Sequence, residues 1–66
     1  MSFDDAFKFL DIWQAENGCT DSEGVQWPSA ESINDARQYL MVLQGLNQPC
    51  PWIVIDGIGG IAFETD

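Results

Sequence analysis

The strongest constraint on the fold is the C-terminal run from Pro51 to Glu64, which has the pattern of an apolar strand, a glycine-rich turn and a second apolar strand. We predict strands over 52–55 and 60–64. The turn Asp56-Gly-Ile-Gly59 has the length that is usually built on a type I turn with a glycine at positive φ. An isolated two-stranded hairpin is only marginally stable in water. Other parts of the chain must therefore cover at least one of its faces.

Two segments ahead of this hairpin have apolar residues at every third or fourth position, which is the period of one helix face. The first spans 3–17 after the candidate N-cap Ser2, and the second spans 30–46 after the candidate N-cap Ser29. We therefore predict an α+β protein, a single small domain over residues 1–66. Two helices precede a C-terminal antiparallel β-hairpin, and the second helix packs across one of its faces.

The connection over 18–28 is polar and rich in turn-forming residues, with Trp27 as the candidate anchor to the core. Val25–Trp27 could add a third short strand to the hairpin, and three residues are too few to decide. Cys19 and Cys50 are expected to be free thiols, as is usual in the cytoplasm. A disulfide between them stays open, because both adjoin turn-forming residues.

The apolar residues exceed what so short a chain can hide, since a domain of this size buries only about 60% of its unfolded surface. Strand side chains alternate between faces, so two helices can cover only one face of the hairpin. Exposed apolar patches usually mark interfaces, and open strand edges invite pairing with another chain. We therefore predict a homodimer or a protein partner. The candidate interaction surface consists of Trp52, Val54, Ile58, Ile61 and Phe63.

The charge is strongly acidic: eleven acids face only two bases, Lys8 and Arg37, for a formal net charge of −9. Direct nucleic-acid binding needs a basic patch that displaces counterions, and none can be assembled. An anionic membrane surface would repel the chain for the same reason. No basic leader and no long apolar run are visible, so we expect a cytoplasmic protein without membrane association.

The residue types offer little chemistry. Without histidine the chain cannot form a catalytic pair with a histidine base or a Cys2His2 zinc site. The glycine-rich turn 56–60 lacks the lysine and the following helix of a phosphate-binding loop. The acidic stretch 21–23 lacks the ligand spacing of an EF-hand calcium loop. We therefore expect no enzyme activity, no catalytic residue, no metal and no cofactor.

Four short motifs lie between about Gly24 and Glu64. They are Trp27-Pro28-Ser29, then Glu31-Ser-Ile-Asn-Asp-Ala36 with Tyr39-Leu40, then Pro51 followed by apolar residues, then Gly59-Gly60-Ile61-Ala-Phe63-Glu64. Together they resemble a group of small, uncharacterised acidic proteins of planctomycetes and some other bacteria. In that group a tryptophan stands at the place of Thr65, and the turn is more polar than Asp56-Gly-Ile. The resemblance implies a fold of helices followed by a hairpin, and it implies no known activity.

Two functional hypotheses follow from the apolar excess and the charge. The first is a non-enzymatic small acidic protein that acts through protein–protein contact, by self-association or with a larger partner. The alternative is an acidic, antitoxin-like inhibitor that mimics nucleic acid and occupies a basic nucleic-acid-binding surface. Salt separates the two, because screening weakens contacts between charges and leaves apolar contacts in place.

Overall fold

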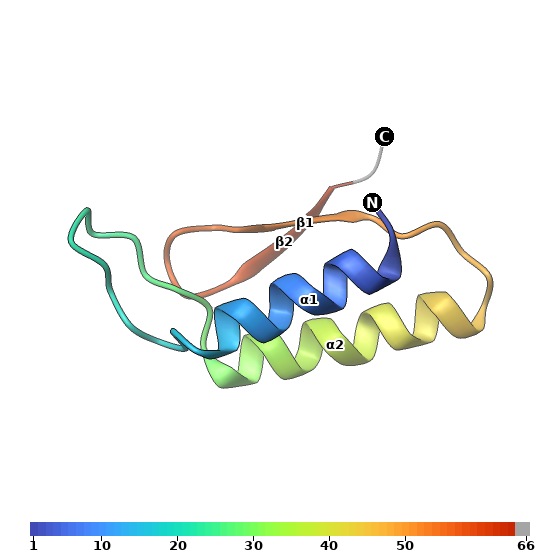
Figure 1. The fold of residues 1–66 in the computed structure, drawn as a ribbon, viewed down its shortest axis with the longest axis horizontal. Helices are drawn as coiled ribbons and strands as arrows, with labels where there is room; N and C mark the ends of the chain where they lie inside the picture. Colours follow the sequence, from blue (N-terminus) through green and yellow to red (C-terminus); the bar gives the residue numbers. More distant parts are fainter. Residues whose placement is uncertain (65–66) are drawn as a thin grey trace.

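The computed structural model describes residues 1–64. Helix α1 spans Phe3–Gln14, helix α2 spans Ala30–Gly45, strand β1 spans Trp52–Ile55 and strand β2 spans Ile61–Glu64 (Figure 1). The predicted α+β order, two helices followed by a C-terminal antiparallel hairpin, is confirmed. Thr65, where the chain departs from the motif that it resembles, lies outside the described residues.

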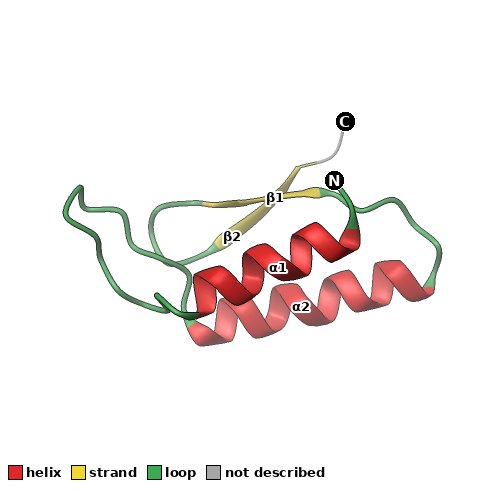
Figure 2. Ribbon diagram, viewed as in Figure 1, coloured by secondary structure: helices red, strands yellow, loops and turns green. Residues whose placement is uncertain are grey.

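The molecule has two layers. Figure 2 shows α1 and α2 running antiparallel in one layer, with the hairpin lying across them in the second. Six buried residues from both layers form the core: Ala6, Leu10, Ile33, Ala36, Leu40 and Ile53. Both helices therefore contribute to the core that lies under the hairpin.

Local hydrogen bonds explain where each helix begins. The Ser2 hydroxyl oxygen accepts a hydrogen bond from the Asp5 N–H at 3.1 Å, and the Ser29 hydroxyl oxygen accepts one from the Ser32 N–H at 3.2 Å. Each serine thereby satisfies one of the N–H groups that a helix start leaves free. Helix α1 ends at Gln14, three residues before the predicted end, because the chain turns over 15–18.

The register of the hairpin decides which residues face the helices. Ile53 pairs with Phe63 and Ile55 pairs with Ile61, whereas Trp52 pairs with Glu64. Residues that pair directly across antiparallel strands share a face. Because Ile53 is only 4% exposed, its face is the inner one, and the face with Trp52 is the outer one.

The connection between the helices holds the tip of the hairpin, although it does not form a strand. Gln26 makes single-residue bridges to Thr20 and to Ile58. Its N–H donates to the Gly57 carbonyl at 2.9 Å, and its carbonyl accepts from the Gly59 N–H at 3.2 Å. The possible third strand over 25–27 is therefore one bridging residue at the turn. Both outer edges of the hairpin stay unpaired among the described residues.

Candidate interaction surface

The structure divides the five residues of the predicted interaction surface among three places. Trp52, which is 50% exposed, and Val54 lie on the outer face of the hairpin. Ile61 and Phe63 lie on the inner face, where Ile61 packs against the core and Phe63 is 37% exposed. Ile58 stands at the tip and is 79% exposed. No single flat face therefore presents all five.

Two open grooves flank the hairpin instead. The first, the α1–β1 groove, has a volume of about 410 Å³ and joins the outer side of α1 to the start of the hairpin. Its lining residues are Met1, Asp5, Lys8, Phe9, Ile12 and Trp52. Three of these are large apolar side chains that are exposed by more than a third: Phe9, Ile12 and Trp52. The Phe9 ring also stacks on Trp13 at a centroid distance of 5.9 Å.

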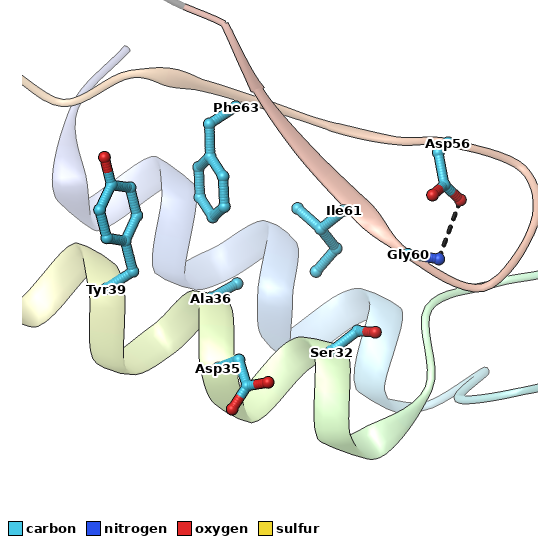
Figure 3. Close-up of a pocket in the computed structure, with 8 residues that line it drawn as sticks. All are labelled: Ser32, Asp35, Ala36, Tyr39, Asp56, Gly60, Ile61 and Phe63. Carbon is cyan, nitrogen blue, oxygen red and sulfur yellow. Dashed lines mark hydrogen bonds between the residues drawn. The ribbon is translucent and has the colours of Figure 1, made fainter.

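The second, the α2–β2 groove, has a volume of about 400 Å³ and lies between the helix and the inner face of β2 (Figure 3). Its lining residues are Ser32, Asp35, Ala36, Tyr39, Asp56, Gly60, Ile61 and Phe63. The rings of Tyr39 and Phe63 meet edge to face at one end, with centroids 4.8 Å apart and planes at 65°. Asp35, beside Ala36 on α2, and Asp56, at the hairpin turn, line the rest of the groove from opposite walls. The groove therefore has an apolar end, and two carboxylates line its remainder.

Asp56 is held in place by the turn that it caps. One of its carboxylate oxygens, Oδ1, accepts hydrogen bonds from the N–H groups of Ile58 and Gly60, each at 2.8 Å. These two backbone donors lower the pKa of Asp56 below its ordinary value, with the bond from Ile58 the larger cause. A side chain at Gly60 would collide with this carboxyl group, so the glycine permits the close approach.

A similar pattern of aspartate hydrogen bonds occurs a second time among the described residues. In the connection, Asp21 Oδ1 accepts hydrogen bonds from the N–H groups of Glu23 and Val25, at 2.8 and 3.0 Å. In both turns the N–H of the aspartate itself donates to the carbonyl four residues later. The acidic stretch 21–23 therefore uses its aspartate to shape a turn.

A third exposed apolar area lies near the end of α2, where Met41, Val42 and Leu46 are each more than half exposed. Met41 and Val42 lie outside the buried stripe of α2, which consists of Ile33, Ala36 and Leu40. The sequence did not group Phe9 and Ile12 with Trp52, because that grouping depends on how α1 and the hairpin cross. The helical period places Phe9 and Ile12 off the centre of the buried stripe. This spacing was the one sequence signal that these two apolar side chains are exposed.

The remaining reactive groups stand apart from these grooves. Cys19 and Cys50 are both free. Burial raises the pKa of the Cys50 thiol, and the nearby positive charge of the chain's N-terminus opposes that rise. Within residues 1–64, no three His, Cys, Asp or Glu side chains are grouped so that they could hold a metal ion. No helix of this described part has the length and apolar character needed to cross a membrane.

Protein-family models, curated proteins and solved structures give no match to this chain. The resemblance of residues 24–64 to small planctomycete-type proteins therefore stays a prediction.

Proposed function

We propose that the chain is a non-enzymatic protein that acts through protein–protein contact, by self-association or with a larger partner. The observation that supports this most directly is the gathering of Phe9, Ile12 and Trp52 around one open groove. Exposed apolar patches of this kind usually mark interaction sites. Tryptophan and phenylalanine are also the residue types that contribute most to binding energy at interfaces.

The unpaired acidic charge favours a second candidate, an inhibitor that occupies a basic nucleic-acid-binding surface. Of the eleven acidic residues, Asp66 lies outside the described part of the chain. Among the other ten only Asp11 forms an ion pair, with Arg37 at 3.0 Å. A surface with so many free carboxylates attracts a cationic protein and speeds the encounter.

Site-specific photo-crosslinking in the producing cells tests the first proposal. We expect a photoreactive phenylalanine analogue at Trp52 to give discrete crosslinked products, because that side chain borders the α1–β1 groove. The same analogue at Glu23, in the exposed connection, serves as the control and should give none. A product of twice the 7.4 kDa chain mass indicates self-association, and a heavier product indicates a larger partner. A Trp52 position that crosslinks no more than Glu23 contradicts the proposal.

Repeating the crosslinking in extracts at low and high salt separates the two candidates. Apolar contact should survive the shorter screening length, which is about 3 Å at 1 M salt and about 10 Å at 0.1 M. Products that disappear at high salt favour the charge-mimicking inhibitor.

A further inference from the structure

We propose that the free edge of β2 binds an extended cationic segment of another protein, which pairs with β2 as a third strand above the α2–β2 groove. The inference rests on the proposed function and specifies the chemistry of the partner. It concerns a different groove from the one that contains Trp52.

The backbone of β2 supplies the hydrogen-bonding groups. The Asp56 N–H donates to the Gly60 carbonyl at 3.2 Å, which makes these two residues a hydrogen-bonded pair of the antiparallel ladder. Hydrogen-bonded and non-hydrogen-bonded pairs alternate along such a ladder. The N–H and C=O groups of Ile61 and Phe63 therefore point away from β1, and none of them bonds another described residue. Extended peptides bind free strand edges of this type.

The side chains of the groove specify two positions of that added strand. Ile61 projects from β2 toward α2, and Phe63 projects beside Tyr39 (Figure 3). Asp35 lines the same groove from α2. Residues two apart on the incoming strand would share this inner face. One of them would lie beside Ile61 within reach of Asp35, and the other would lie on the Tyr39–Phe63 ring pair. A basic residue and an apolar residue at that spacing fit the two places.

Charge decides between the possible occupants. The α2–β2 groove contains two carboxylates, Asp35 and Asp56, and no lysine or arginine among its lining residues. The α1–β1 groove, in contrast, is lined by Lys8 and by Met1 at the N-terminus. A second copy of this chain carries the same net charge of −9 over its whole length, so its approach is opposed by repulsion. A cationic partner segment is therefore the complementary occupant.

A defined peptide tests this pairing on the whole protein. The probe is the capped heptapeptide Thr-Arg-Thr-Leu-Thr-Arg-Thr, whose arginines and leucine share one face and which reads the same in both directions. We expect it to shift the backbone amide resonances of Ile61 and Phe63 more than those of Ile53 and Ile55 on the other edge. The isomer Arg-Thr-Thr-Leu-Thr-Thr-Arg has the same composition with the arginines on the opposite face, and it should bind several-fold more weakly.

Two further comparisons separate strand pairing and charge recognition from general attraction. Asp35→Asn should weaken binding of the probe by up to about fivefold, the upper value for an exposed ion pair. Glu16→Gln, which removes one exposed charge outside both grooves, should leave it unchanged. In the second comparison, one peptide is N-methylated at the central leucine and another at a neighbouring threonine. Only one of the two should lose binding, because alternate N–H groups point to opposite edges of a strand.

The inference is overturned if the heptapeptide does not bind or if its isomer binds equally well. It is also overturned if the resonance shifts are confined to the β1 edge or to the α1–β1 groove. Equal effects of Asp35→Asn and Glu16→Gln on binding overturn it as well. None of these results affects crosslinking through Trp52. The broader proposal of protein contact is therefore decided by the crosslinking experiment alone.

Discussion

Asp56 stabilises the hairpin turn through its charged form. Its carboxylate accepts two backbone hydrogen bonds, from Ile58 and Gly60, and these lower its pKa in the folded protein. A carboxyl group whose pKa is lower when folded stabilises the protein above its unfolded pKa, and that contribution is lost as the pH falls through the folded pKa. The unfolded value is about 3.9.

We expect Asp56→Asn to lower the thermal midpoint at neutral pH and to have less effect as the pH falls below about 4. Asparagine keeps an acceptor oxygen in the turn and lacks the charge. The measurement is thermal unfolding followed by circular dichroism at a series of pH values. Glu16→Gln, whose exposed side chain accepts no hydrogen bond from the described residues, is the control. A deficit for Asp56→Asn that stays constant or grows on acidification would refute the assigned role of the charge.

The packing of the hairpin against the helices depends strongly on Ile53, the one β1 residue in the buried core. Replacing a buried isoleucine with alanine costs about 2–5 kcal/mol. The core of so small a domain supplies only about 3–5 kcal/mol. We therefore expect Ile53→Ala to leave the protein largely unfolded at room temperature, as measured by urea titration. Val54→Ala, one residue along on the outer face, should remain folded, and equal losses for the two variants would contradict the observed register.

The Tyr39–Phe63 contact joins α2 to β2 at the apolar end of the groove. We expect Phe63→Ala to cost about 2 kcal/mol, less than the ~3–5 of a fully buried phenylalanine, because the side chain is 37% exposed. A double-mutant cycle with Tyr39→Leu and Phe63→Leu should give a coupling of about 0.5–1.5 kcal/mol in urea unfolding. Additive losses would mean that the ring contact contributes nothing beyond burial.

Periodicity was sufficient to predict the elements and their order. Strand β1 begins and ends where it was predicted, and β2 begins one residue later because the Gly60 N–H bonds the Asp56 side chain. The two grooves could not be predicted in the same way. Alternation shows which residues of one strand share a face. The pairing of Ile53 with Phe63 is needed to show which face of β2 matches the buried face of β1.

At the scale of the whole molecule, like charges repel one another across the fold. The longest dimension is 38 Å, close to the screening length of about 30 Å at 0.01 M salt. At 0.15 M the screening length is about 8 Å, so most of this repulsion is removed. We expect the thermal midpoint to rise when salt is increased over this range. In the double variant Glu16→Gln with Glu23→Gln, the thermal midpoint should rise less over the same salt range, because two negative charges are removed. A midpoint that falls with added salt would contradict net self-repulsion.

The carbonyl of Gly59 accepts two hydrogen bonds, from the Ser29 N–H and from the Ser32 hydroxyl, each at 3.1 Å. The Gly59 N–H is bound in turn to Gln26. These hydrogen bonds join the tip of the hairpin, the connection and the first turn of α2 in one network. Groups joined in this way open as a cooperative unit. The amide protons of Gln26, Ser29 and Gly59 should therefore exchange with solvent together, at the rate at which the hairpin tip lifts from the helix.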